Sequence, residues 1–365
     1  MGKHDASRTR GGVDPDTFDP RKSDQGPRSG RGWERLVSSA VAPGIWATLM
    51  PFPSPLSYSY SYSIQVADGI VVVDLGWDSD AGWSAFEHGL SRAGATMEEI
   101  VGVVVTHAHP DHYGLAPRIR ENTDVWIATH PLERTLITPT AEARAVRLEN
   151  MTIWMTASGV PTEHVAALHD EAAEIAAMMV PIEPDIDLAD RDIIPGTDGV
   201  LQAIHTPGHT AGSMCFFDRE RNALMTGDHF LPRVTPNVSK RPESSRAPLA
   251  DFLSSLDRIG SIGTDPMILP GHEWAFDRRD SRISEIVAHH EVRLDEIEQA
   301  VGAGASTTWE VATAVSWSRP FAELEPRNRR QAIGETFAHL HHLVGKGRLR
   351  VREGTPTLWF PLPRK

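Results

Sequence analysis

The stretch IVGVVVTHAHPDH, residues 100–112, decides the fold more than any other part of the chain. Its first six residues are all apolar or glycine, which predicts a buried strand. Four side chains that commonly bind metals follow that strand at once: His107, His109, Asp111 and His112. Because a turn after a strand fixes such neighbours, the first two histidines can converge on one metal ion, and the aspartate and third histidine on another.

Other histidine pairs in the chain have a plainer interpretation. Paired histidines occur on ordinary protein surfaces, and we interpret His289–His290 and His341–His342 in that way. Neither pair follows an apolar strand directly, so neither is expected to bind a metal.

The order of an apolar strand followed by a polar loop recurs further along the chain. His209 in Pro-Gly-His, Asp228 in Gly-Asp and His272 in a second Pro-Gly-His each follow a predicted strand, and Asp74 ends the predicted strand of residues 70–74. Each loop alone is also explained by a turn with a solvated side chain. The three loops together, in this order after the histidine cluster, form a more specific pattern.

In this order the motifs resemble the metallo-β-lactamase superfamily, over about residues 45–274. The resemblance implies an α/β fold, a four-layer αββα sandwich, with two divalent metal ions. It implies a first metal held by His107, His109 and His209, a second held by Asp111, His112 and His272, and a bridging carboxylate from Asp228. Zinc is favoured, and iron or manganese would fit the same nitrogen and oxygen ligands.

Asp74 matches an aspartate that supports the metal loop from outside the ligand set in that family. The alternative is a solvent-facing aspartate at a strand end. Asp228 together with His112 resembles the glyoxalase II, lactonase and nuclease branches rather than true β-lactamases, which lack this bridging carboxylate. Well-known lactonases place a tyrosine where this chain has Leu231, which argues against a close match to them.

Three regions are predicted along the chain. Residues 1–32 lack apolar periodicity and are expected to form a disordered tail. Residues 33–280 would form the hydrolase domain. In it, the alternating serines and tyrosines of 57–63 and the apolar run of 70–74 predict a hairpin, and residues 192–204 predict a strand. A helical insertion is expected at about 132–180, with a break near Gly159. Helices expected at 283–300, 308–315 and 329–344, followed by a hairpin, give residues 281–365 the pattern of a winged-helix-like α+β domain.

Bulk composition limits the function. The formal net charge of −13 disfavours a general nucleic-acid-binding surface unless positive charge is locally concentrated. The single cysteine excludes a thiolate-rich metal cluster and fits a reducing cytoplasm, and no segment resembles a membrane span or secretory signal. Residues 281–365 hold 12 Lys or Arg against 10 Asp or Glu, so a cap beside the site or a homodimer contact is favoured over DNA binding.

The expected reaction is hydrolysis by a hydroxide that two metal ions make from water, with Asp111 orienting it and passing on its proton. The leading substrates are a thioester, an ester or a lactone, as a small molecule. The alternatives are a phosphodiesterase or nuclease, a β-lactamase, and a DNA-binding regulator that senses a ligand. Tyr113, His229, Met151 and Trp154 are candidate substrate contacts, although each is equally explained by packing or, for His229, by a surface position.

Overall fold

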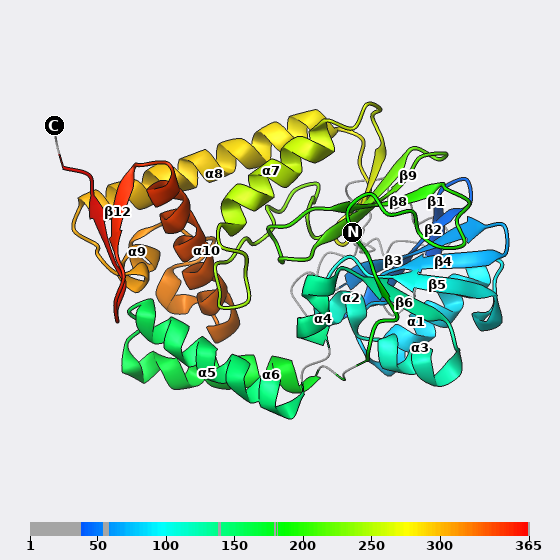
Figure 1. Ribbon diagram of the computed structural model, residues 1–365, viewed down its shortest axis with the longest axis horizontal. Helices are drawn as coiled ribbons and strands as arrows, with labels where there is room; N and C mark the ends of the chain where they lie inside the picture. Colours follow the sequence, from blue (N-terminus) through cyan, green and yellow to red (C-terminus); the bar gives the residue numbers. More distant parts are fainter. Residues whose placement is uncertain (1–37, 54–57, 138–139, 179, 181, 364–365) are drawn as a thin grey trace, which may run out of the picture.

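Two mixed β-sheets lie face to face in one half of the molecule, on the right in Figure 1, with helices on both outer faces. The computed structural model describes residues 38–363 apart from 54–57, 138–139, 179 and 181. The predicted tail of residues 1–32 therefore lies outside the described residues. The expected αββα sandwich is confirmed.

The first sheet has seven strands in the order β1-β2-β3-β4-β5-β6-β7. Their bounds are Ser38–Ala42, Ile45–Pro51, Tyr58–Val66, Gly69–Val73, Ile100–Val104, Trp126–Thr129 and Ile186–Asp187. The β3–β4 hairpin predicted from the alternating serines and tyrosines is confirmed, and β4, β5, β6 and β7 run parallel. Parallel strands place their carboxyl ends at the same edge, which is where the polar loops follow.

The second sheet has four strands in the order β11-β10-β9-β8. Their bounds are β8 Leu201–His205, β9 Met214–Asp218, β10 Ala223–Gly227 and β11 Met267–Pro270. The sequence predicted a strand over residues 192–204, but only its last part is one. Residues 195–199 form turns with Gly196, Asp198 and Gly199 at positive φ, which a continuous strand does not allow.

Helices complete the two outer layers. The helices before β7 are α1 Asp80–Arg92, η2 Met97–Glu99, α2 Pro110–Tyr113, α3 Ala116–Asn122, α4 Pro131–Ile137, α5 Ala141–Ala157 and α6 Thr162–Met178. Helices α1, α3 and α4 pack on the outer face of the first sheet through Phe86, Ile119 and Ile137. The predicted break in the insertion near residue 159 is confirmed, but α4 belongs to the sandwich, and only α5 and α6 project away from it (Figure 1).

Helix α7, Pro248–Gly260, covers the outer face of the second sheet and was missed by the sequence analysis. Leu249, Phe252, Leu256 and Ile259 recur at helical spacing and are all fully buried. Pro248 occupies the first turn, where a missing N–H costs no hydrogen bond. The periodic signal was therefore present in the sequence.

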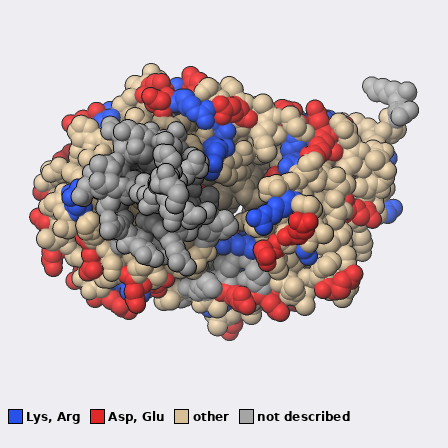
Figure 2. All heavy atoms as spheres, turned by 180° about the vertical axis from the view of Figure 1, so that it is seen from behind, with Lys and Arg blue, Asp and Glu red and all other residues tan. Residues whose placement is uncertain are grey.

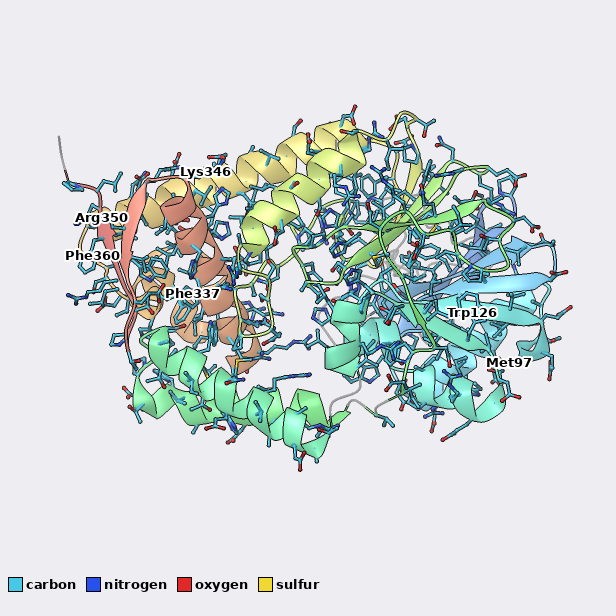
Figure 3. The ribbon with its side chains drawn as sticks, viewed as in Figure 1. Met97, Trp126, Phe337, Lys346, Arg350 and Phe360 are labelled. Carbon is cyan, nitrogen blue, oxygen red and sulfur yellow. The ribbon has the colours of Figure 1, made fainter. Side chains whose placement is uncertain are left out.

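The remaining elements form a C-terminal helical region. Their bounds are α8 Arg279–Gly302, α9 Thr308–Ala314, η3 Phe321–Glu323, α10 Pro326–Gly345, β12 Leu349–Arg352 and β13 Leu358–Pro361. Phe337 of α10, labelled in Figure 3, packs on Trp154 of α5 and Trp359 of β13, with ring centroids 6.3 and 5.5 Å apart. The α5–α6 pair therefore packs on the C-terminal region.

One apolar core joins this region to the sandwich. It runs from Leu224 and Ile268 of the second sheet through Phe252 of α7 to Ile286 and Leu340 of the C-terminal helices. Each of these side chains is fully buried. Among the described residues, no helix has both the length and the apolar composition that a membrane crossing requires.

Candidate metal centre

The loops that follow five strands meet at one edge of the sandwich and bring the predicted ligands together. Asp74 follows β4, the HAHPDH loop follows β5, and single residues follow β8, β10 and β11. Two groups of side chains are close enough for each to hold an ion: His107, His109, His209 and Asp228, and Asp111, His112 and His272. In each group one ligand atom per residue lies within 4.8 Å of the others.

Asp228 lies between the two groups. Its Oδ2 is 3.8 Å from His209 Nε2 in the first group. Its Oδ1 is 3.2 Å from His272 Nε2 and 3.4 Å from His112 Nε2 in the second group. One carboxylate thus faces both groups with a different oxygen, which is the arrangement a bridging ligand requires.

The histidine rings are oriented by partners on their far side. The Nδ1–H of His209 donates to the Asn237 carbonyl at 2.9 Å, and that of His272 donates to the Tyr58 carbonyl at 2.8 Å. These bonds leave the Nε2 lone pair of each ring facing the centre, as metal binding requires.

Two buried atoms at the centre have no hydrogen-bond partner among the described residues: His112 Nε2 and Asp228 Oδ1. A buried polar atom without a partner is costly, so such atoms commonly mark a ligand or ion. In the first group, His109 Nδ1 lies 2.8 Å from His107 Nε2 and 3.1 Å from His209 Nε2. Convergent lone pairs and orphaned atoms both fit a pair of metal ions.

The pKa values of the histidines in the two groups also favour the binding of cations. Burial, followed by the neighbouring histidines, lowers the pKa of His107 well below its usual value and that of His109 to about 3, so both rings are neutral ligands. Burial also lowers the pKa of His272, but Asp228 and Asp111 outweigh it and raise that pKa to about 10. The carboxylates thus stabilise positive charge at this position, which a divalent ion would supply in place of protons.

Asp74, directly after β4, forms hydrogen bonds that connect the HAHPDH loop to the first sheet. It receives hydrogen bonds from the backbone N–H and the hydroxyl of Thr106, both at 2.8 Å, and its Oδ2 lies 2.7 Å from His112 Nδ1. The residue is buried and adopts φ of +60°, which aspartate tolerates better than most residues. The alternative of a solvent-facing strand-end aspartate does not hold.

Glycine is required where the β11 loop passes the centre. A Cβ on Gly271 would lie 2.6 Å from Asp228 Oδ1 and 2.7 Å from His112 Cε1. No side chain fits there without moving a predicted ligand. This explains the glycine of the second Pro-Gly-His sequence in steric terms.

Glu133 was missed by the sequence analysis. It lies on α4, is fully buried, and accepts hydrogen bonds from the backbone N–H groups of Ala108 at 2.8 Å and Gly212 at 2.7 Å. One carboxylate therefore ties the HAHPDH loop to the loop that carries His209. An isolated glutamate in a helical stretch gave no signal of this role.

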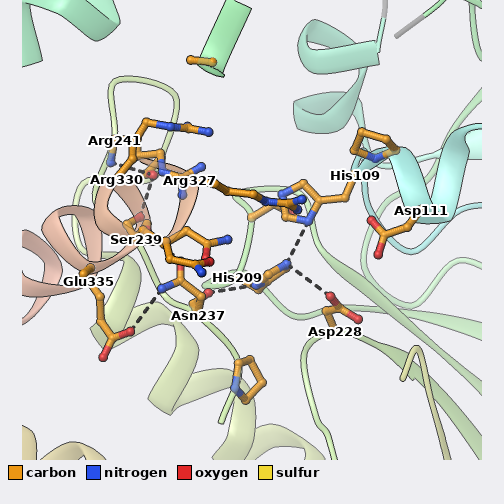
Figure 4. Close-up of a pocket in the computed structure, with 18 of the residues that line it drawn as sticks. His109, Asp111, His209, Asp228, Asn237, Ser239, Arg241, Arg327, Arg330 and Glu335 are labelled. Carbon is orange, nitrogen blue, oxygen red and sulfur yellow. Dashed lines mark hydrogen bonds and ion pairs between the residues drawn. The ribbon is translucent and has the colours of Figure 1, made fainter. Parts of the chain in front are cut away.

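Asn237 and Glu335 were also missed. The Asn237 carbonyl accepts from His209, and its side-chain amide donates to Glu335 of α10 at 3.1 Å (Figure 4). Burial raises the pKa of Glu335 above its usual value. A chain of two contacts thus joins a predicted ligand to the C-terminal region.

A cavity of about 860 Å³ opens from the centre toward α5 and α10. His109, Asp111, His209, Asp228 and His272 form its floor. Of the predicted substrate contacts, Met151 lines this cavity and Tyr113, Trp154 and His229 do not. Tyr113 donates to the Ile182 carbonyl, and His229 packs edge-on against Phe252, with neither of its ring nitrogens bonded to a described residue.

The surface interpretation of His290 is wrong, and so is the surface alternative for His229. His229 and His290 are both 1% exposed. His290 Nδ1 lies 3.0 Å from His339 Nε2, and His339 Nδ1 donates to the Glu335 carbonyl. His289–His290 therefore contributes one ring to the core between α8 and α10, because adjacent helical residues face different directions.

Residues 55–272 match the family model of the metallo-beta-lactamase superfamily. Among curated proteins, the chain is 33% identical over 130 residues to an uncharacterized protein of Aquifex aeolicus, covering 36% of this chain and 49% of that protein. It is 27% identical over 172 residues to the acyl-coenzyme A thioesterase MBLAC2 of Homo sapiens, covering 46% of this chain and 54% of that protein. The chain thus spans about half the length of these relatives.

Two solved structures resemble a larger part of the chain. A metallo-beta-lactamase family protein from Thermus thermophilus superposes with a TM-score of 0.73 at 28% identity, covering 88% of this chain and 100% of that one. A beta-lactamase domain protein from Burkholderia ambifaria gives a TM-score of 0.75 at 25% identity, covering 89% and 94%. The likeness extends beyond the residues that the family model matches.

Proposed function

This chain belongs to the metallo-β-lactamase superfamily, and we propose that it is a hydrolase of the glyoxalase II-like branch that uses two divalent metal ions, zinc being favoured. The observation that carries the proposal is the position of Asp228, whose two oxygens face two separate groups of ligands. We propose carboxylic thioesters, esters or lactones as substrates, with thioesters first.

When bound, two such ions would lower the pKa of a water molecule between the two groups toward ~7 and polarise the acyl carbonyl. The protein's own residues would position the reactants. Asp111 lines the cavity, with Oδ2 3.3 Å from His272 Nε2. The histidines His112 and His272 outweigh the effect of burial and hold the pKa of Asp111 below its usual range, so it is ionised and can accept a proton from the attacking water and return it to the leaving group.

Two features support a thioester. The similar protein MBLAC2 is described as an acyl-coenzyme A thioesterase. The cavity is also lined by Phe52, Trp77, Leu148 and Met151, apolar side chains suited to an acyl chain that we call the apolar wall.

We propose that the C-terminal region, a winged-helix-like unit, caps the site instead of binding DNA. The helix expected at 329–344 is the one that would face DNA in a winged-helix unit, and Arg329 and Arg330 are its only cations. Arg330 is 6% exposed and lines the cavity, and Arg329 donates to the carbonyls of Ala322 and Leu324. Arg330 thus faces the cavity and Arg329 bonds the protein's own backbone, which argues against contact of either with duplex DNA.

A substrate panel tests the proposal. Protein loaded with zinc or manganese would be assayed with a thioester, a lactone, bis-p-nitrophenyl phosphate and a chromogenic cephalosporin, alongside a gel-shift assay with duplex DNA. We expect turnover of the thioester first and about two metals per chain by elemental analysis. Turnover of the phosphodiester alone would indicate a phosphodiesterase or nuclease instead, and turnover of the cephalosporin alone a β-lactamase. DNA binding without hydrolysis would indicate a DNA-binding regulator.

A further inference from the structure

Six arginines line the same cavity: Arg144, Arg147, Arg241, Arg319, Arg327 and Arg330. They come from α5, from the loop before α7, and from the segment around the start of α10. No lysine is among the described residues that line the cavity. We call this set the arginine wall.

The charge of this wall is opposite to that of the chain, which carries a formal −13. Outside the metal groups, the acidic residues lining the cavity are Glu243, Glu323, Glu325 and Glu335, so arginines outnumber them by six to four. Two divalent ions bound at the metal groups would carry more positive charge than Asp111 and Asp228 carry negative charge. The cavity would then be more positive still. An acidic protein thus has a locally cationic cavity.

The two arginines of α5 lie three residues apart, on the same face of the helix. Burial lowers the pKa of Arg147; Glu243 opposes this effect, and Arg144 adds to it. The Nε of Arg144 is buried without a hydrogen-bond partner in the described part of the chain. Holding like charges together at a half-buried position costs free energy, and an anion placed between them would recover it.

Three arginines of the wall lie across the cavity from the metal groups. In Figure 4, Arg241, Arg327 and Arg330 gather on one side, and Asp111 lies on the other, with His109 and His209 between them. From behind the molecule, Lys and Arg atoms border the hollow in its face (Figure 2). A substrate whose carbonyl lies at the metal groups and whose acyl chain follows the apolar wall would extend its other half toward the arginines.

We propose that the arginine wall binds phosphate groups on the thiol half of the thioester, so that the leaving group is a phosphorylated thiol. The inference rests on the proposed function. Arginine binds phosphate through two parallel hydrogen bonds, and several arginines exceed what a single carboxylate needs. The volume of about 860 Å³ is large enough for an extended ligand with more than one anionic group.

Kinetics with matched substrates test this inference. One acyl group would be offered as the thioester of pantetheine, of 4′-phosphopantetheine and of coenzyme A. We expect KM to fall at least about tenfold from the first to the last, since tenfold in affinity is 1.4 kcal/mol. A drop already complete at phosphopantetheine would assign the wall to that single phosphate, and a further drop at coenzyme A to its nucleotide phosphates. Equal KM values for all three would overturn the proposal.

The double variant Arg144→Gln/Arg147→Gln should raise KM for the coenzyme A thioester at least about tenfold more than for the pantetheine thioester. Arg92→Gln is the matched control, because Arg92 is exposed at the end of α1 and does not line the cavity. If the double variant misfolds, Arg327→Gln replaces it, because Arg327 is exposed and its loss leaves the core intact. A rise in KM shared equally by both thioesters would contradict the inference.

A binding measurement separates this inference from the proposed reaction. Titration of 4′-phosphopantetheine and of coenzyme A, with pantetheine as the phosphate-free control, would be followed by calorimetry in both proteins at equal metal content. We expect binding that weakens at least about tenfold in the double variant and falls as salt rises. If this holds while no thioester is hydrolysed, the phosphate site stands and the proposed function fails. Equal binding in both proteins would contradict the phosphate-binding inference and leave the proposed function standing.

Discussion

The edge of the sandwich and the arginine wall hold their charged groups in opposite ways. At the sandwich edge Asp74, Glu133 and His112 are buried and bonded to fixed partners, so each ring and carboxylate has one orientation. On the arginine wall Arg330 is buried, but Arg319 and Arg327 are exposed. If the proposed function holds, this difference places the reaction and the selection of substrate in separate parts of the molecule, and mutations should separate them.

The largest effect should come from the residue that faces both groups of ligands. Asp228→Ala should lower kcat/KM by about 10³-fold or more and reduce metal content, because several kcal/mol of stabilisation depend on the ions. His229→Leu should change kcat/KM by less than about tenfold, since neither of its ring nitrogens is bonded to a described residue. Activity and elemental analysis of both variants check this. Equal losses would mean that the bridge is misassigned.

A smaller effect is expected one step away from the ligands. Asp74→Asn keeps the shape of the side chain but removes the charge beside His112 Nδ1, 2.7 Å away. Such partners typically contribute about 10–100-fold to metal affinity or activity. Metal titration of the variant should show a loss in this range, with the KM difference between phosphorylated and unphosphorylated thioesters retained. A change in this KM difference would mean that the sandwich edge also contributes to the selection of substrate.

The C-terminal core should respond to acid through its buried histidines. Burial, then the neighbouring His339, lowers the pKa of His290 to about 2, and burial lowers that of His339 to about 3. Both pKa values lie below the unfolded value of about 6.5, so the unfolded state binds more protons, and stability falls as pH drops from about 6.5 toward 3.

The loss is at most about 1.4 kcal/mol per pH unit for each group. Denaturant unfolding of metal-free protein between pH 7 and 4 measures it. His290→Phe should flatten the pH dependence, and His88→Phe, on the exposed face of α1, should leave it as in the wild type. An unaltered slope in the first variant would show that the acid response comes from the sandwich instead.

The smallest effect is expected at Cys215, which lies in the core between the second sheet and α7. Burial raises its pKa to about 12, so very little thiolate exists at pH 8. A thiol reagent should leave the folded protein unmodified for hours and react on unfolding. Rapid reaction of the folded protein would mean that this core opens more readily than the rest of the sandwich.

The sequence predicted the sandwich edge well for a physical reason. There the predicted ligands follow apolar strands within a few residues, as His107 and His272 do. The apolar pattern predicts the strand, and its end predicts where the ligand lies. The strand predicted at 192–204 was too long because its turns depend on positive φ at Gly196 and Asp198, which apolar pattern does not report.

The arginine wall could not be predicted in the same way. Arg144, Arg241 and Arg327 are distant in sequence and meet only because α5 packs on the C-terminal region. Glu133 and Asn237 were missed for a related reason, since their partners are distant in sequence: Glu133 bonds backbone N–H groups of two loops, and Asn237 bonds the side chains of His209 and Glu335. Helix α7 differs from these, because Leu249, Phe252 and Leu256 have a helical period that was readable.

The contact chain from His209 through Asn237 to Glu335 has a thermodynamic consequence. Linkage is reciprocal: if docking of α10 orders His209 for metal binding, metal binding must favour docking of α10 by the same free energy. At a metal concentration one hundred times Kd, the gain in stability is about 2.7 kcal/mol. Part of this gain in stability should appear in α10, a helix that carries no metal ligand. Slower amide hydrogen exchange in α10 on metal addition would measure that part.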